Sequence, residues 1–116
     1  MTKLVGRKCK PCEGGVAPLN VDEAVALMQQ LSETWSLGAD AAFIERRFEF
    51  SVYSRTVAFA NAVAWLATNE GHHPELTVKY GTCKVRFFTT AINGLSENDF
   101  ICAAKIDRMI EDYNYG

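Results

Sequence analysis

The amino-acid sequence predicts a single α+β domain in which helices cover one face of a four-stranded antiparallel sheet. The chain has 116 residues, of which 48% are hydrophobic, and this suits one domain with one buried core. Three stretches repeat apolar residues with helical spacing, and four stretches alternate apolar and polar residues as strands do. The predicted order is helix, strand, strand, helix, strand, strand, helix. Strands that arrive in pairs between helices favour an antiparallel sheet with the helices on one face.

The first 19 residues are predicted to form an extended arm (residues 1–19), and the domain is predicted to span residues 20–116. Prolines and paired glycines work against regular structure in the arm: Pro11, Gly14, Gly15 and Pro18. Cys9 and Cys12 have the CxxC spacing of half a zinc site or of a redox pair. No second CxxC completes a zinc site, so a reduced or loosely structural pair on the arm is the simpler interpretation.

The first helix is expected over residues 21–32. Asn20 is a suitable N-cap, and Asp22 and Glu23 place carboxylates in the first turn, where they suit the helix dipole. One apolar stripe with helical spacing predicts a surface helix, and it consists of Val21, Val25, Met28 and Leu31.

Two strands are expected next, at residues 35–37 and 43–50, joined by a turn at residues 38–40. In the longer strand the apolar and charged side chains fall on opposite faces: Ile44, Phe48 and Phe50 against Glu45, Arg47 and Glu49. Arg46 interrupts the apolar face. The alternation indicates a half-buried antiparallel strand whose hairpin partner lies upstream.

The second helix is expected over residues 55–69, with Ser54 as its cap, and its sequence leaves almost no polar face. A helix that is apolar all round has to be covered all round. The small sheet covers one side, so we predict that a second subunit covers the other and that the protein is a homodimer or homotetramer through this helix. The alternative is a helix enclosed wholly within one chain.

A second pair of strands is expected at residues 76–80 and 83–90, with a turn at Gly81. The last helix is expected over residues 97–112. Its apolar stripe consists of Phe100, Ala103, Ile106, Ile110 and Tyr113. Cys83 and Cys102 lie in apolar segments and are expected to be small core residues.

Both histidines of the chain lie side by side, in the segment Glu70-Gly71-His72-His73-Pro74. Glycine ends a helix readily, and proline prevents its continuation, so the two imidazoles are held at a helix-to-strand corner. Histidine is the side chain that titrates nearest to neutral pH, which suits proton transfer on a polar heterocycle. Metal binding and a purely structural role are the alternatives that the residues leave open.

Composition excludes several classes of function. A net charge of −2 gives no basic footprint for nucleic acid. No apolar run approaches the roughly 20 residues that span a bilayer, and no apolar segment of a secretory signal is present. We therefore expect a cytoplasmic protein that binds neither nucleic acid nor membrane.

The histidine corner belongs to a longer ordered pattern. It comprises Gly71-His72-His73-Pro74, Tyr80 after five intervening residues, Gly94-Leu95-Ser96, and the segment from Asp99 to Asp107. With this pattern the chain resembles the pterin-4a-carbinolamine dehydratase family over residues 20–107. The resemblance implies an α+β fold with a four-stranded antiparallel sheet, and dimers or tetramers with helices packed between subunits.

The resemblance also implies an activity: dehydration of 4a-hydroxytetrahydropterins to quinonoid dihydropterins, which recycles the cofactor of aromatic amino acid hydroxylases. By resemblance, His72 is the acid/base catalyst, His73 mainly holds the pterin and Pro74 fixes the pair. Asp99 is the acidic residue that closes the motif. We expect these four residues and Thr90 to contact the substrate, with neither a cofactor nor a metal ion.

The chain departs from the family pattern at two positions. The family usually has an acidic residue four positions before the first histidine, where this chain has Thr68, and Glu70 lies two residues away. It also usually has a third histidine, or a tryptophan, ten residues after the tyrosine. That position is Thr90, whose hydroxyl can form hydrogen bonds but does not titrate near neutral pH.

The Thr90 difference leaves two hypotheses. In the first, the protein is a dehydratase that turns over more slowly than its relatives. In the second, it is a catalytically reduced member that binds other proteins, as relatives do that act as transcription-factor partners or as Rubisco assembly factors. Retention of both His72 and His73 favours the first hypothesis.

Overall fold

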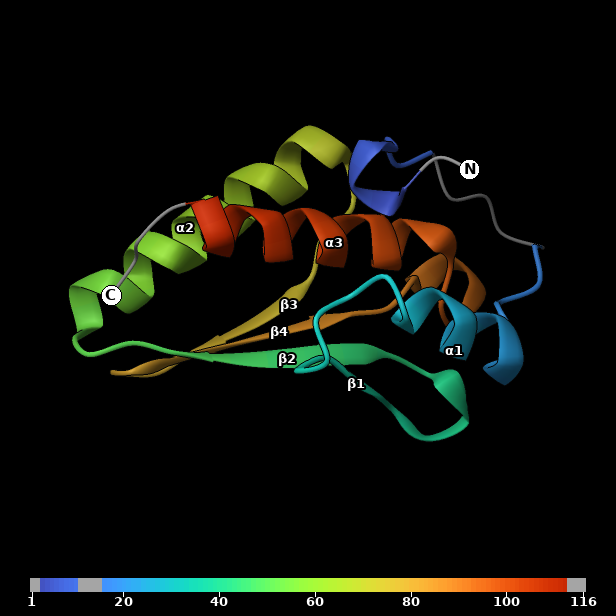
Figure 1. Cartoon of the computed structure of the whole chain (residues 1–116), viewed down its shortest axis with the longest axis horizontal. Coiled ribbons are helices and arrows are strands. Elements are labelled where there is room, and N and C mark those ends of the chain that lie inside the picture. The colour runs from blue at the N-terminus through green and yellow to red at the C-terminus, as the bar shows by residue number, and fades with distance from the viewer. Residues whose placement is uncertain (1–2, 11–15, 113–116) are drawn as a thin grey trace.

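The predicted order of elements is confirmed by the computed structural model, which describes residues 3–10 and 16–112 (Figure 1). The three α-helices of the described part are α1 (Val21–Met28), α2 (Tyr53–Glu70) and α3 (Glu97–Asp112). Its four strands are β1 (Ser36–Leu37), β2 (Ile44–Glu49), β3 (Glu75–Val78) and β4 (Thr82–Phe87). Short 3-10 helices are η1 (Leu4–Gly6), η2 (Ala39–Ala41) and η3 (Thr90–Ile92). Figure 1 shows α2 and α3 side by side over one face of the sheet.

The sheet is antiparallel throughout, with strand order β1-β2-β4-β3. β1 with β2 and β3 with β4 are hairpins of sequential strands. The central pair joins β2 to β4, and its register places Ile44 opposite Phe87 and Phe48 opposite Cys83. The predicted α+β class with a four-stranded antiparallel sheet is therefore confirmed.

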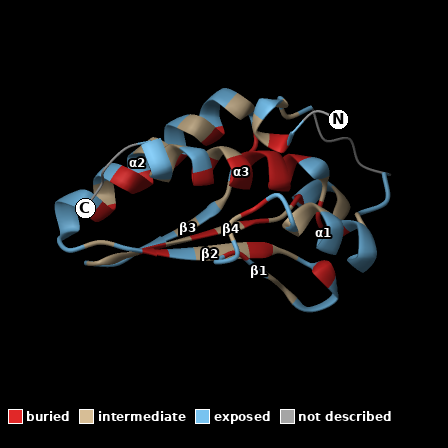
Figure 2. Ribbon diagram, viewed as in Figure 1, coloured by how far each residue is buried: buried red, intermediate tan, exposed pale blue. Residues whose placement is uncertain are grey.

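The core lies between the sheet and the helices, as the band of buried residues in Figure 2 shows. Alternate residues of β4 point into it, namely Cys83, Val85 and Phe87, all fully buried. Cys102 on α3 is equally buried, so both cysteines predicted for the core lie there. Burial raises the pKa of the Cys83 thiol to about 11.

Arg46, which interrupts the apolar face of β2, lies on the core side because α3 offers it a partner. Its Nη1 is 2.7 Å from Oδ1 of Asp107. The same carboxylate accepts a hydrogen bond from Trp35 Nε1 at 2.7 Å and, at Oδ2, from the backbone N–H of Ser32 at 2.8 Å. A buried charge is tolerated where it is paired and hydrogen-bonded in this way.

The predicted stripe of the first helix is wrong in part. α1 ends at Met28, and Val21 and Val25 are exposed, whereas Ala24 is fully buried. The small Ala24 side chain lets the helix approach the domain closely. The capping prediction is correct: Asn20 Oδ1 accepts from the Glu23 N–H at 2.8 Å, and Glu23 Oε1 accepts from the Asn20 N–H at 2.9 Å.

The prediction that Ser54 caps α2 is wrong. The helix begins at Tyr53, two residues before the predicted start at residue 55, and Val52 is the N-cap without a side-chain hydrogen bond. Thr56 stabilises this end instead, because its Oγ1 donates to the carbonyls of Val52 at 3.1 Å and Tyr80 at 2.9 Å. One side of α2 packs into the core, and the opposite side, with Trp65, is exposed.

The arm is anchored to the domain at Leu4, which is only 1% exposed and lies within the core. The Leu4 N–H donates to Oε1 of Gln30 at 3.1 Å. Cys12 and Tyr113 lie outside the described residues. No helix in the described part of the chain is long and apolar enough to cross a membrane.

Candidate functional site

The histidine corner is built by the way α2 ends. Gly71 adopts the left-handed conformation, with φ of 67°, and its N–H donates to the carbonyl of Thr68 at 3.3 Å. The N–H of His72 donates to the carbonyl of Ala67 at 3.2 Å, so the last turn closes on itself. A Cβ at position 71 would meet no atom within 4 Å, so the backbone conformation, not space, is what calls for glycine.

The two histidines have opposite environments. The His72 residue is 9% exposed, and its ring stacks on Phe87 with 6.0 Å between centroids and 8° between planes. Its Nε2 lies 2.5 Å from Oδ1 of Asp99. His73 is exposed, and Pro74 after it is half-buried. The imidazole of His72 is thus held in the interior, and the imidazole of His73 lies on the surface.

Asp99 is fully buried in the first turn of α3 and organises the interior side of the site. Its Oδ2 accepts hydrogen bonds from Thr89 Oγ1 at 2.8 Å and from the backbone N–H of Ser96 at 2.9 Å. The hydroxyls of Thr89 and Ser96 are also 2.8 Å apart. Asp99 thus reaches back to the N–H of Ser96, as the acidic residue of a capping box does.

Thr89 is held in place by the turn that follows β4. Its N–H donates to the carbonyl of Gly94 at 2.7 Å, and the Gly94 N–H donates back at 3.4 Å. This bridge closes the loop containing η3 and fixes the Thr89 hydroxyl beside the first turn of α3. Three elements therefore meet at one carboxylate: the end of α2, the end of β4 and the start of α3.

This arrangement assigns the nitrogens of His72. An ionised Asp99 can only accept hydrogen bonds, so Nε2 carries the proton that faces it. In the neutral imidazole the other nitrogen, Nδ1, is then the basic atom. Within residues 3–10 and 16–112, no lysine or arginine forms an ion pair with Asp99. The negative charge beside His72 is therefore available to stabilise an imidazolium.

The two positions that depart from the family pattern lie at the edges of this cluster. Thr90 is exposed at the start of η3, one residue beyond the buried Thr89. Thr68 is exposed, and its Oγ1 donates to the carbonyl of Ala64 at 2.8 Å. The structure thus brings His72 and Asp99 into direct contact. His73 and Pro74 directly follow His72 in the chain, and Thr90 directly follows Thr89, which donates to Asp99.

Glu70 does not take the place of an acidic residue at position 68. Its Oε2 is 2.7 Å from Lys105 Nζ, and its Oε1 accepts from the Cys9 N–H at 3.0 Å. Burial alone would raise the pKa of Glu70, but these two hydrogen bonds and the lysine charge outweigh it, so the pKa is lowered. Glu70 thus connects the arm to α3.

Thr89, Ser96 and Phe87 are site residues that sequence reasoning missed. A signal was available for two of them: counting by two from Cys83 along the strand puts Phe87 and Thr89 on the core-facing side. The comparison with the family pattern drew attention to Thr90, whereas the hydroxyl that bonds Asp99 belongs to the preceding residue, Thr89. No group of three or more His, Cys, Asp or Glu side chains in the described part is arranged to hold a metal ion.

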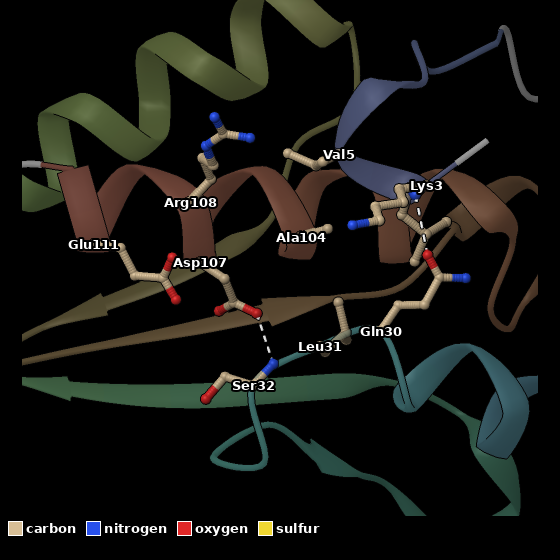
Figure 3. Close-up of a pocket in the computed structure, with 10 residues that line it drawn as sticks. Lys3, Val5, Gln30, Leu31, Ser32, Ala104, Asp107, Arg108 and Glu111 are labelled. Carbon is tan, nitrogen blue, oxygen red and sulfur yellow. Dashed lines mark hydrogen bonds between the residues drawn. The ribbon is translucent and has the colours of Figure 1, made fainter.

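A pocket of about 720 Å³ lies elsewhere, between η1, the loop after α1 and α3 (Figure 3). Its lining includes Leu4, Leu31 and Ala104, with Asp107 at its wall, and neither His72 nor Asp99 belongs to it. Three donors already occupy the carboxylate of Asp107. The Asp107 carboxylate is therefore already bonded, and the other charged residues of the lining are Lys3, Arg108 and Glu111. No histidine lines the pocket, so the candidate site for chemistry is the His72–Asp99 cluster.

Comparison with known proteins agrees with the sequence resemblance. The family described as pterin 4 alpha carbinolamine dehydratase matches residues 17–109. A protein of Nitrosomonas europaea is 52% identical over 108 residues, which cover 93% of this chain and 94% of that protein. A protein of Legionella pneumophila (strain Corby) is 47% identical over 109 residues, with 94% and 96% covered. Both carry the provisional name pterin-4-alpha-carbinolamine dehydratase.

Two solved structures share the fold. A transcriptional coactivator/pterin dehydratase from Brucella melitensis superposes with a TM-score of 0.73 at 27% identity, covering 79% of this chain and 97% of that one. A pterin dehydratase-like protein, identified as a RuBisCO assembly factor in the alpha-carboxysome, gives a TM-score of 0.56 at 23% identity, covering 66% and 89%. At that identity the second likeness shows the fold alone.

Proposed function

The chain belongs to the pterin-4a-carbinolamine dehydratase family, and from this premise we propose that it dehydrates 4a-hydroxytetrahydropterins to quinonoid dihydropterins. The observation that carries the proposal is the buried His72–Asp99 pair, with the exposed His73 as the next residue. The reaction requires a base that removes a ring-nitrogen proton and an acid that protonates the departing hydroxyl. Such positioned proton transfers typically contribute about 10²–10⁴-fold each.

We assign the base role to Nδ1 of His72. Asp99 is a positioning residue that holds the ring by Nε2 and stabilises the imidazolium formed when Nδ1 takes the proton. His73 binds the pterin from the surface side, and Pro74 limits the freedom of both histidines. The proton on Nδ1 can then return to the leaving hydroxyl, which departs as water.

Thr90 supplies a hydrogen-bonding hydroxyl where the family usually has a third titrating group. Its exposed position allows contact with a bound substrate, but threonine cannot exchange a proton near neutral pH. One imidazole then serves both proton transfers in turn, and we expect turnover slower than in relatives that have the third histidine.

The test is the dehydration rate of a 4a-hydroxytetrahydropterin, with pterin binding measured in parallel. We expect the wild type to exceed the spontaneous rate, His72→Ala to lose the acceleration, and Thr90→His to gain roughly tenfold or more. Thr77→His, a change at an exposed threonine of β3, is the matched control and should leave the rate unchanged. If wild type and Thr90→His both stay at the spontaneous rate and neither binds pterin, the proposal is wrong.

Binding without turnover would favour the second hypothesis, a protein-binding or assembly role on the same scaffold. The solved structure of a RuBisCO assembly factor shows that such a role exists on this fold. In the first hypothesis a pterin-dependent aromatic amino acid hydroxylase would supply the 4a-hydroxytetrahydropterin, and the dihydropterin product would need a two-electron reduction before that enzyme could use it again.

We also propose that the protein is a homodimer or homotetramer through α2. Trp65 is 66% exposed on the side of α2 that faces away from the core, and Ala58 and Ala64 are exposed beside it on the same helix. The exposed indole provides an apolar surface suited to a second helix, and Asn61 and Asn69 flank it one turn away on the same face. The molar mass in solution of wild type and Trp65→Glu tests this, and a wild-type monomer would contradict it.

A further inference from the structure

Two cysteines far apart in sequence meet beside the histidine corner. The Sγ atoms of Cys9 on the arm and Cys102 on α3 are 3.5 Å apart, although 93 positions separate the residues. Cys102 is fully buried, Cys9 is partly exposed, and both are free thiols. The proposed dehydration uses neither.

Hydrogen bonds hold the backbone of the arm where this contact occurs. The N–H of Lys10 donates to Oδ1 of Asn98 at 3.0 Å, and Nδ2 of Asn98 donates to the Lys10 carbonyl at 2.6 Å. The N–H of Cys9 donates to Glu70 Oε1 at 3.0 Å. These bonds connect Cys9 and its neighbour to the end of α2 and the start of α3, so the meeting of the two sulfurs is supported by backbone contacts.

We propose that Cys9 and Cys102 form a redox modification site, which takes a small-molecule disulfide as its oxidant and closes to an intrachain disulfide. The Cys9 thiolate attacks the small disulfide, forming a mixed disulfide and releasing one thiol. The Cys102 thiolate then attacks the Cys9 sulfur and releases the second thiol. One disulfide is reduced, one is formed, and the protons of the two cysteines end on the two released thiols.

The order of the two steps follows from the environment of each sulfur. Cys102 is enclosed by the core, and the pKa of its thiol is raised by its contact with the Cys9 thiol and by burial. A buried thiol of this kind does not meet an oxidant from solution. Cys9 is therefore the attacking group, and Cys102 is the resolving group at contact distance.

Closure requires only a small movement. A disulfide has a sulfur–sulfur distance of about 2.05 Å, so the present 3.5 Å has to shorten by roughly 1.5 Å. The arm can supply this shift, since its residues 7–10 form no regular structure. The resulting bond would fix the arm next to the active corner, because Cys102 Sγ lies 4.0 Å from the carbonyl oxygen of His72.

The experiment equilibrates the full-length wild type with increasing ratios of oxidised to reduced glutathione, in the presence of a chelator. Remaining thiols are then alkylated, and the linked peptides are mapped by mass spectrometry. We expect a Cys9–Cys102 peptide pair, with Cys83 still reduced. We also expect a rise in melting temperature of at least about 5 °C, because the bond closes a long loop.

Cys12→Ser is the matched variant, and it should form the same bond with the same rise in melting temperature. Cys9→Ser should lose both effects. A Cys9–Cys12 bond in the wild type with no Cys9–Cys102 bond in Cys12→Ser would overturn the proposal. A stable glutathione adduct on Cys9, or an unchanged melting temperature after bond formation, would overturn it as well.

Discussion

Two buried aspartates on α3 show how one helix supports two different kinds of site. Asp99 and Asp107 are eight residues apart, about two turns, and both carboxylates accept three hydrogen bonds from the described residues. Both connect the helix to segments distant in sequence. They differ in the charge of their partners.

The partners of Asp107 are fixed in their protonation. Arginine does not act as a proton donor in proteins, and the partners besides Arg46 are the indole of Trp35 and the backbone of Ser32. Such a cluster has one electrostatic state, so it stabilises the fold and does no chemistry.

Asp99 has no permanent cation among the residues that the structure describes. Its donors are the Thr89 hydroxyl, the Ser96 N–H and the titratable ring of His72. Of these three donors, the imidazole is the one that can exchange a proton, which is what a proton-transferring pair requires. Burial and hydrogen-bond number are alike in the two carboxylates, so the fixed counter-charge at Asp107 is the feature that separates it from the carboxylate that we propose for the site.

The largest expected effect is on stability, from Asp107→Ala. The change leaves the partly buried guanidinium of Arg46 without its partner, so we expect a loss of about 3–5 kcal/mol in the free energy of unfolding. Urea denaturation measures it. Asp112→Ala is the control, because the exposed Arg108–Asp112 contact of 3.7 Å should contribute under about 0.5 kcal/mol. A loss below about 1 kcal/mol for Asp107→Ala would show that the cluster is not structural.

The next effect is on catalysis, from Asp99→Asn. The amide cannot stabilise an imidazolium, so we expect kcat to fall about 100-fold, or about 2.7 kcal/mol of transition-state stabilisation, with a change in the pH profile. Asp107→Asn serves as the comparison and should lower stability while the kcat of the folded protein stays near wild type. The reverse pattern would refute the assignment of Asp99 to the site.

A smaller effect is expected from Thr89→Val, which keeps the shape of the side chain and removes the donor to Asp99. We expect a loss of about 1–2 kcal/mol in unfolding free energy, since Asp99 Oδ2 then keeps only the Ser96 N–H. Thr90→Val at the exposed neighbouring position should cost nearly nothing. Equal effects of the two changes, measured by urea denaturation, would show that the Thr89 hydrogen bond is unimportant.

The smallest effect is expected from Glu70, whose carboxylate forms an ion pair with Lys105. Its folded pKa lies below the ordinary value of 4.5, so the charged form stabilises the fold. This contribution is complete above pH 4.5 and is lost as the pH falls through the folded pKa. We expect it to be below about 1 kcal/mol and to disappear in Glu70→Gln. Glu49→Gln removes an exposed ion pair and should leave the decrease in stability at acid pH unchanged. If Glu70→Gln also left it unchanged, the pairing of Glu70 would be unimportant.

The sequence predicted the order of elements because helical and strand periodicities are local and strong in this chain. It did not predict which side of α1 faces the core, because Ala24 and Val25 both belong to apolar patterns. Tertiary packing decides that Ala24 is buried and Val25 exposed. The start of α2 was missed because Thr56 stabilises it through a contact with Tyr80, which no local capping rule contains.

The candidate site was predicted in part, and through resemblance more than through physics. His72 and Asp99 do meet, and the glycine end of α2 was read correctly. The hydrogen bond from Thr89 to Asp99 was not predicted, and the contact of Thr90 with the substrate stays a prediction. The contact between Cys9 and Cys102 joins an irregular arm to a helix, and no sequence periodicity in either segment predicts it.

The topology of the sheet has a consequence for how the chain folds. The two outer strand pairs are hairpins that can close locally, but the central pair joins Ile44 to Phe87 with all of α2 and β3 between them. Closing that loop costs chain entropy before the central hydrogen bonds form. We therefore expect the docking of β2 against β4 to limit the folding rate.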